Sequence, residues 1–309
     1  MYRTEKTAIL LATYNGEKYI REQIDSILAQ TDTDWVLYIH DDGSKDQTME
    51  VVKEYVDKYP EQIIVVEGAP TGGAKSNFFY LFHQVEAPFY MCCDQDDVWL
   101  PEKIEITRKE MENLIRGDED KPALVFTELG VVDGELNVIA ENMRDYQGLD
   151  CKNVRLNRAL IQNVVTGCTM MVNRVLRDEM TKITEYTDVL MHDWWATLVA
   201  VRFGKVSFIE QPTILYRQHG NNGVGASNAN SLMYQMKRML QGEEIKQSLV
   251  NTRKQARLFA DIYKEEENSL VKQYADLGNK GKLSRLQFYK KYDVKKSTRA
   301  KNIGLMIWG

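Results

Sequence analysis

Three carboxylates within four residues are the feature of this sequence best suited to chemistry. Asp94, Asp96 and Asp97 directly follow the apolar run 87–93, and Pro101 comes soon after them. The run has the length of a buried strand and proline favours the first turn of a helix, so the acids should lie between a strand and a helix. Carboxylates at the end of a buried strand are costly unless a cation neutralises them, and oxygen ligands suit Mg²⁺ or Mn²⁺. The alternative is an acidic helix N-terminus without a metal, a position where Asp is common.

The elements before these acids alternate between two periodicities. Apolar runs of strand length at 7–12, 35–40 and 63–66 alternate with helix-like spacing at about 17–30, 48–58 and 77–85. Alternating strands and helices predict a Rossmann-like α/β fold with a mostly parallel sheet, in which ligands bind beyond the carboxyl ends of the strands. The polar turns 13–16, 41–48 and 94–97 should therefore meet in one crevice. Ordinary turns are the alternative, since Asp, Asn, Gly and Ser are common in them.

The length, composition and net charge of the chain limit the class of protein. The 309 residues, 43% hydrophobic and 28% charged, suffice for a large globular domain with an appendage. A net charge of −5 argues against a nucleic-acid partner. Cys92, Cys93, Cys151 and Cys168 form no Cys-x-x-Cys pair and favour small buried hydrophobes in a reducing compartment. No apolar run has the length of a membrane span, so a cytoplasmic protein is expected.

The motifs resemble the nucleotide-sugar half of family-2 glycosyltransferases. The matching stretches are Thr13-Tyr14-Asn15-Gly16, Asp41-Asp42-Gly43-Ser44-Lys45-Asp46-Gln47-Thr48 and Asp94-Gln95-Asp96-Asp97-Val98-Trp99-Leu100-Pro101. The resemblance implies the glycosyltransferase-A fold, with a catalytic domain at 1–225 and a helical region with a basic tail at 226–309. It divides the catalytic domain into a nucleotide-sugar half, about 1–105, and an acceptor half, about 106–225.

The resemblance also implies roles for single residues. Asp94 and Asp96 would hold Mg²⁺ or Mn²⁺, with Asp96 the more direct ligand and His219 completing the shell. Tyr14 and Asp41 would contact the nucleotide base. The full set implied at the donor is Thr13, Tyr14, Asn15, Asp41, Asp42, Lys75, Asp94, Gly167, Trp194 and Arg217. Within this set Gly167 would lie beside the donor sugar, or be a plain bulge glycine, and Arg217 would clamp the diphosphate.

The second half of the catalytic region continues the α/β pattern. We expect a strand at 124–127, a hairpin at 130–142 with its turn at Asp133-Gly134, and a helix from 157. The stretch 163–173 should be a glycine-containing turn that leads into a buried strand. A helix at 194–203 and an edge strand at 209–217 with Pro212 should follow. Asp193, in His192-Asp193-Trp194, is by resemblance the catalytic base. The alternative for Asp193 is the N-cap of the helix after it, and both can hold at a pocket rim. Trp194 and Trp195 could stack on sugar or pack in the core.

A narrower resemblance concerns the donor. Tyr216-Arg217-Gln218-His219-Gly220-Asn221-Asn222, together with Asp-Gln-Asp-Asp and His-Asp-Trp, is similar to the bacterial rhamnosyltransferase branch. That branch uses dTDP-β-L-rhamnose to build cell-wall or capsular polysaccharide. It implies an inverting transfer of L-rhamnose to a hydroxyl of a growing glycan or lipid-linked acceptor.

Other functions stay open at this point. The donor could instead be UDP-glucose, UDP-galactose or a UDP-N-acetylhexosamine. A sugar nucleotidyltransferase would need a glycine-rich basic loop after the first strand, where 13–16 offers none. A non-catalytic subunit would not need Asp41, Asp94, Asp96 and Asp193, all of which are present.

The pattern changes after residue 230. Leu232, Met233, Met236, Met239 and Leu240 follow helical spacing, and Gly242 should separate them from a second helix that carries Ile245 to Ile262. Between Lys280 and Lys301 there are nine Lys or Arg and one acid, Asp293, among aromatic residues. Such a tail either contacts an anionic membrane face peripherally, here the inner face of the cell membrane, or docks on its own domain or a partner subunit. The oligomeric state is open.

Overall fold

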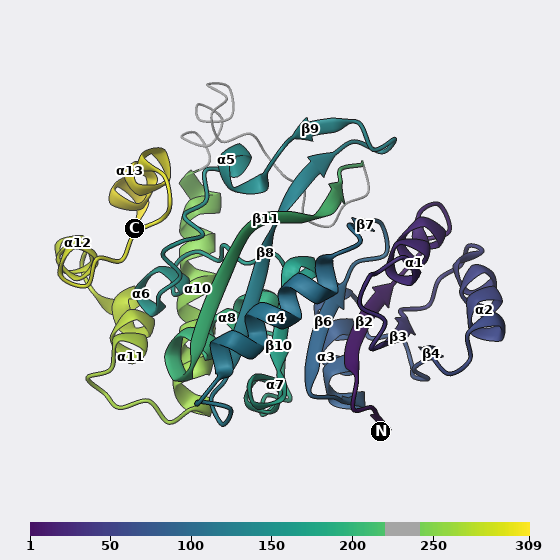
Figure 1. The fold of residues 1–309 in the computed structure, drawn as a ribbon. Coiled ribbons are helices and arrows are strands. Elements are labelled where there is room, and N and C mark those ends of the chain that lie inside the picture. Colours follow the sequence, from purple (N-terminus) through teal and green to yellow (C-terminus); the bar gives the residue numbers. More distant parts are fainter. Residues whose placement is uncertain (220–241) are drawn as a thin grey trace.

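The computed structural model describes residues 1–219 and 242–309 (Figure 1). Its strands are β1 Tyr2–Arg3, β2 Thr7–Thr13, β3 Trp35–Asp41, β4 Ile63–Val65, β5 Val85–Glu86, β6 Phe89–Cys93, β7 Val98–Trp99, β8 Ala123–Val132, β9 Val138–Ala140, β10 Met170–Asn173 and β11 Lys205–Arg217. Its helices are α1 Ile20–Leu28, α2 Thr48–Lys58, α3 Ala74–Gln84, α4 Lys103–Ile115, α5 Met143–Gln147, α6 Leu156–Ala159, α7 Arg174–Met180, α8 His192–Phe203, α10 Gly242–Ile262, α11 Leu270–Ala275, α12 Lys282–Lys291 and α13 Arg299–Trp308. Short 3₁₀ turns lie at Gly167–Thr169 and Asp276–Asn279.

A nine-stranded sheet in the described part of the chain organises the molecule. Its order is β4-β3-β2-β6-β10-β8-β11-β7, with β9 paired to β8. The N-terminal half is parallel, as predicted, since β2 pairs parallel with both β3 and β6. β10 is antiparallel to both β6 and β8, so the parallel pairing expected for most of the sheet holds within the first half and again between β8 and β11. The α/β fold class is confirmed.

Two apolar cores cover the two faces of the sheet. Successive residues of a strand point to opposite faces, so Ile9 and Leu11 enter one core while Ala8 and Leu10 enter the other. Helices α1, α2 and α4 contribute to the first core, and α3, α7, α8 and α10 contribute to the second. Burial on both faces is why the central strands read as continuous apolar runs rather than alternating ones.

The hairpin predicted at 130–142 is present, formed by the end of β8 and by β9. Its turn spans 133–137, because the Asp133 carboxylate accepts hydrogen bonds from the backbone N–H of Glu135 and of Asn137, each at 2.9 Å. The strand predicted from 209 begins earlier, at Lys205. Pro212 lies where the register of β11 against β8 shifts, which is a position that tolerates a residue without an N–H.

Helix α8 begins one residue before Asp193. Met191 is its N-cap and His192 its first residue, so the reading of Asp193 as the N-cap was wrong. Asp193 instead lies in the first turn, where backbone N–H groups are free and the helix dipole favours a negative charge.

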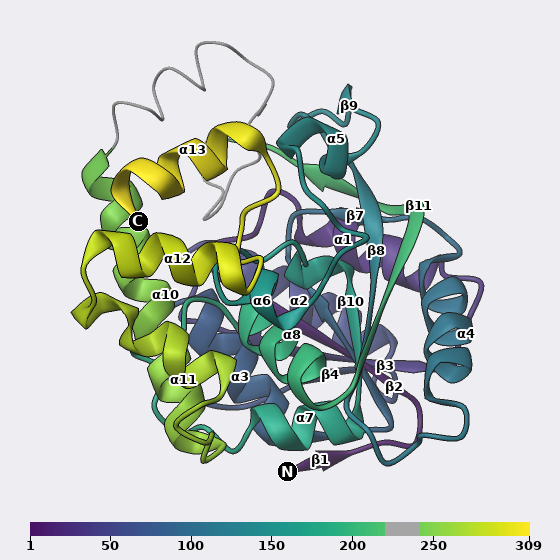
Figure 2. The same ribbon diagram turned by 90° about the vertical axis from the view of Figure 1, so that its left-hand side faces the viewer.

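The C-terminal helices pack against the sheet domain (Figure 2). The ring of Phe259 on α10 lies 5.4 Å from Trp195 and 6.0 Å from Phe203, both on α8. The helical extension is thus confirmed, and it shares a core with the helix that carries Asp193. The proposed boundary at 225 and the stripe from Leu232 to Leu240 lie outside the described residues.

Candidate active site

The polar turns predicted to meet do line one cleft, of about 700 Å³, at the carboxyl ends of β2, β3 and β6. Thr13 and Tyr14 follow β2, Asp42 follows β3, and Asp94 and Asp96 follow β6. The opposite wall comes from the second half of the chain. It includes Met143, Gln147, Asn163, Gly167, His192, Asp193, Trp194 and Tyr216.

Gln95 ties the first turn to the acidic turn. Its Oε1 accepts hydrogen bonds from Thr13 Oγ1 at 2.6 Å and from the Tyr14 N–H at 2.8 Å, and its Nε2 donates to the Tyr14 carbonyl at 3.0 Å. A Cβ on Gly16 would lie 2.4 Å from the same Oε1, so the first turn needs glycine there. Sequence reasoning missed Gln95, because it treated the residue between the two acids as a spacer.

Asn15 and Asp41 hold the second turn in place. Asp41 Oδ2 accepts hydrogen bonds from the N–H of Gly43 and of Ser44. The Asn15 N–H donates to Ser44 Oγ at 2.8 Å, and Asn15 Oδ1 accepts from the Lys45 N–H at 2.8 Å. Neither Asn15 nor Asp41 belongs to the described lining of the cleft, so both shape its rim from behind.

Asp42 and Lys75 are engaged by nearby backbone. Asp42 accepts hydrogen bonds from Thr71, Gly72 and Gly73. Burial would raise the pKa of the Asp42 carboxyl, yet these donors together lower it. Lys75 Nζ donates to the carbonyls of Tyr186 and Val189 at 2.7 Å each, while burial lowers its pKa. Asp42 lines the cleft, and Lys75 fixes the segment that leads to α8.

Three acids meet in the cleft although Asp193 is about a hundred positions from the other two. Burial raises the pKa of Asp94 to about 7, and the carboxylates of Asp96 and Asp193 add to the shift. Burial also raises the pKa of Asp193 to about 7. The backbone N–H groups of Trp194 and Gly167 and the Asn163 amide lower this pKa, but by less than burial raises it. Asp193 Oδ1 has no hydrogen-bond partner among the described residues. A carboxylate that lines a cleft and has a pKa near neutrality is suited to accept a proton.

His219 and Arg217 complete the acidic side. His219 Nε2 lies 2.7 Å from Asp96 Oδ2. The Arg217 side chain is 2% exposed and donates to the carbonyls of Asp96 and Gly134 and to the Glu22 carboxylate. Arg217 therefore holds the acidic turn from inside the protein. It is not among the described residues that line the cleft.

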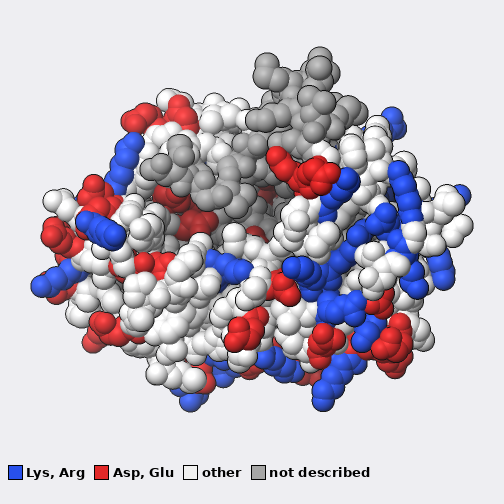
Figure 3. All heavy atoms as spheres, turned by 180° about the vertical axis from the view of Figure 1, so that it is seen from behind, with Lys and Arg blue, Asp and Glu red and all other residues white. Residues whose placement is uncertain are grey.

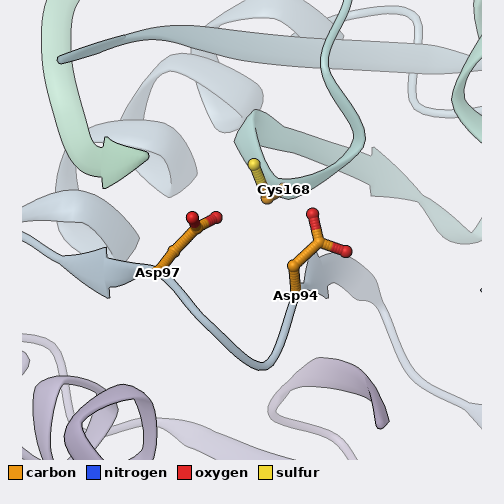
Figure 4. A group of neighbouring side chains, drawn as sticks. All are labelled: Asp94, Asp97 and Cys168. Atoms are coloured by element: carbon orange, nitrogen blue, oxygen red, sulfur yellow. The ribbon is translucent and has the colours of Figure 1, made fainter. Parts of the chain in front are cut away.

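A second group of donor atoms lies beside Asp94 (Figure 4). One ligand atom from each of Asp94, Asp97 and Cys168 lies within 4.8 Å of the others. Burial, with the charges of Asp97 and Asp94, raises the pKa of the Cys168 thiol well above its usual value, so the thiol stays protonated. Lys103 is buried nearby with a pKa lowered by burial to about 8, and its ammonium lies 4.8 Å from the Trp99 ring. A protonated thiol beside an ammonium suits a hard cation poorly.

The acids facing the cleft fit a hard divalent cation better. Asp94 and Asp96 both present carboxylates to the cleft, the charge of Asp96 raises the pKa of Asp94, and His219 supplies an imidazole at Asp96. Carboxylate oxygens with an imidazole nitrogen suit Mn²⁺, and Mg²⁺ through the oxygens.

Gly167 has a local steric reason to be glycine. A Cβ there would lie 2.7 Å from His192 Nε2. The His192 ring is buried, and its centroid lies 4.1 Å from that of Phe78. Next to it, Trp194 lines the cleft while its Nε1 donates to the Ala159 carbonyl at 2.6 Å, and Trp195 is fully buried in the core. One tryptophan thus faces the cleft and the other packs.

Comparison with known proteins identifies the class. The chain belongs to glycosyl transferase family 2, whose model matches residues 8–178. It is 32% identical over 235 residues to the dTDP-rhamnosyl transferase RfbG of Shigella flexneri, covering 70% of this chain and 74% of RfbG. It is 26% identical over 215 residues to an uncharacterised glycosyltransferase of Rickettsia typhi, of which it spans 64%.

Solved structures share the fold. Residues 1–349 of S. aureus TarS in complex with UDP superpose with a TM-score of 0.52 and 16% identity, over 93% of this chain and 78% of that TarS chain. The mannosyltransferase PcManGT of Pyrobaculum calidifontis, in complex with GDP-Man and Mn²⁺, superposes with a TM-score of 0.52 and 17% identity. The match covers 99% of this chain and 87% of the PcManGT chain. The Rossmann-like architecture of the glycosyltransferase-A type is therefore confirmed for this chain.

The raised pKa of Asp193 predicts a pH-dependent cost of its burial. Between the ordinary pKa of Asp and about 7 the folded protein keeps a proton that the unfolded chain has lost, so Asp193 contributes less stability as pH rises. Asp193→Asn carries no such charge. The difference in Tm, variant minus wild type, should therefore increase by roughly 5 °C from about pH 5 to about pH 8. Calorimetry in EDTA measures it.

The comparison is made at each pH because His192 acts in the opposite sense. Burial lowers the pKa of His192 to about 3, and this residue is present in both proteins. Asp120→Asn, at an exposed position, is the control and should follow wild type. A difference in Tm between Asp193→Asn and wild type that does not change with pH would contradict the assignment.

Proposed function

We propose that this protein is an inverting, metal-dependent glycosyltransferase that moves L-rhamnose from dTDP-β-L-rhamnose to a hydroxyl of a growing cell-surface glycan or lipid-linked acceptor. The observation that carries the proposal is the meeting of Asp193 with Asp94 and Asp96 in one cleft. The relative that is a dTDP-rhamnosyl transferase supports the donor.

Asp193 is the proposed catalytic base. Its carboxylate, which lines the cleft, would take the proton of the acceptor hydroxyl as that oxygen attacks the anomeric carbon. The C–O bond to the nucleotide diphosphate breaks on the opposite face, and the diphosphate carries away the bonding electrons. Because that leaving group is already stable as an anion, no acid need protonate it, unlike in glycoside hydrolysis.

Asp94, Asp96 and His219 are the proposed metal ligands. A divalent cation bound there supplies positive charge that offsets the charge on the departing diphosphate. Arg217 and Gln95 fix the backbone of the acidic turn, so the carboxylates are held in place before the donor arrives.

The proposed donor-binding residues fall into two groups. Thr13, Tyr14, Asp42, Gly167 and Trp194 line the cleft and would contact the donor directly. Asn15, Asp41, Lys75 and Arg217 bond the loops around it and would act by positioning those loops. Half-exposed Tyr14 is the residue best placed to stack on a base.

A donor screen tests the proposal. Nucleotide release with Mn²⁺ should be fastest for dTDP-rhamnose among dTDP-rhamnose, UDP-glucose, UDP-galactose and their N-acetyl forms. A faster release from a UDP-sugar would keep the transferase and replace the donor. Formation of a nucleotide sugar from a nucleoside triphosphate would instead favour a nucleotidyltransferase.

Loss of the Asp193 carboxylate should separate binding from turnover. Asp193→Asn should bind nucleotide sugar with unchanged affinity, yet turn over at least ~100-fold more slowly, the scale typical of a lost general base. Calorimetry and a nucleotide-release assay measure the two quantities. Full turnover by this variant would refute the role, and Asp120→Asn serves as the unaffected control.

Removal of the Asp96 side chain should uncouple donor binding from metal. Asp96→Ala keeps the backbone carbonyl that Arg217 holds, so the turn should stay folded. We expect the enhancement of donor affinity by Mn²⁺ to be lost in calorimetry. Equal enhancement in variant and wild type would remove Asp96 from the metal site.

A further inference from the structure

The outer side of the C-terminal helices exposes large apolar side chains. On α13, Ile303, Met306 and Ile307 are 45%, 61% and 48% exposed, and on α12 Leu283 is 77% exposed. Single exposed apolar residues are common on proteins, but these are neighbours. Ile303 shares one helical face with Met306 and Ile307, and Lys282 Nζ donates to the Ile307 carbonyl at 2.9 Å, which ties the start of α12, where Leu283 lies, to the end of α13. We call these four residues the α12–α13 surface.

The inner side of α13 explains why this surface faces outward. Leu305 is 4% exposed, and a Cβ on Gly304 would lie 3.3 Å from Ile245 of α10. Lys246 Nζ, also on α10, lies 5.0 Å from the Trp308 ring. One face of α13 is thus docked on α10, and among the described residues none buries the other face.

The segment that forms α12 and leads into α13 is rich in positive charge. The exposed bases are Lys280, Lys282, Lys290, Lys291, Lys295 and Arg299. The acid among them, Asp293, is paired with Arg158 and Lys295. Figure 3 shows Lys and Arg gathered on the side of the molecule that carries these helices. The chain as a whole has a net charge of −5, so this positive charge is local.

We propose that the α12–α13 surface binds an anionic lipid bilayer, with its apolar side chains inserted at the boundary between headgroups and acyl chains. A helix with one apolar face flanked by Lys and Arg lies in the plane of such an interface. Each nearby Lys or Arg adds attraction to anionic headgroups. A second copy of this chain fits less well, because a two-fold contact would bring the two sets of bases face to face.

The position of α13 connects this surface to the cleft. Lys301 Nζ donates to the Gln147 carbonyl at 3.2 Å, and Gln147 and Met143 of α5 line the cleft. Figure 2 shows α13 at the same end of the molecule as α5. Bilayer binding would therefore hold the cleft near lipid. The idea that bilayer binding brings the cleft to a lipid-linked acceptor rests on the proposed function. The binding of the α12–α13 surface to a bilayer does not.

Vesicle flotation tests the surface. The protein should float with vesicles of phosphatidylcholine mixed with phosphatidylglycerol, and much less with phosphatidylcholine alone or at high salt. Met306→Glu combined with Ile307→Glu should lower the bound fraction ~10-fold or more. Val250→Glu, the same kind of change at a 41% exposed position on α10, should leave binding unchanged.

Three outcomes would overturn the inference. The first is equal binding to neutral and anionic vesicles, and the second is full binding by the Met306/Ile307 variant. The third is a wild-type dimer in sedimentation, or a stable complex with an acidic protein, that the same variant abolishes while lipid binding is absent.

Nucleotide release in lipid-free solution separates this test from that of the proposed function. The Met306/Ile307 variant leaves the cleft intact and should release nucleotide like wild type, with an unchanged Tm showing that it is folded. Loss of flotation with normal release supports the surface. If no donor is turned over by wild type, the proposed function fails while the flotation result stands by itself.

Discussion

The burial of like charges is the constraint on which the rest of the structure depends. Asp94, Asp96 and Asp193 face one cleft, where burial raises the pKa of Asp94 and of Asp193, and the nearby charges of Asp96 and Asp193 raise the pKa of Asp94 further. Such a group persists only where the surrounding structure determines its position and a ligand supplies the missing positive charge. The sheet provides the first condition, because β6 ends at the acidic turn and α8 begins beside it. A bound divalent cation would provide the second.

The turns around the cleft are joined to one another by hydrogen bonds. Gln95 joins the acidic turn to the first turn, Asn15 joins the first turn to the second, and Asp42 joins the second to the loop at 71–73. Lys75 and Arg217 then anchor the far sides of the cleft. Several residues that the resemblance assigns to donor binding thus form hydrogen bonds that hold the loops around the cleft in place. Bracing of this kind reduces the ordering that binding would otherwise require.

The C-terminal helices extend this rigid frame. Phe259 packs on Trp195, so α10 is fixed to the helix that presents Asp193, and α13 is fixed to α10 through Leu305 and Trp308. The exposed apolar face of α13 is therefore held in a defined position relative to the cleft. No helix among the described residues is long and apolar enough to cross a membrane.

The sequence by itself determined the α/β class, the first-half strands and helices, the hairpin at 130–142 and the turns that line the cleft. It could do so because these features depend on local periodicity and on the rule that parallel strands end at the same edge of a sheet. Only the tertiary structure decided that β10 runs antiparallel between β6 and β8, that Asp193 follows the N-cap, and that Arg217 faces inward to Glu22. Those facts depend on contacts between residues up to 195 positions apart, which spacing along the chain does not encode. For the same reason the sequence motif did not reveal that Gln95, between the two acids, bonds Thr13 and Tyr14 in the first turn.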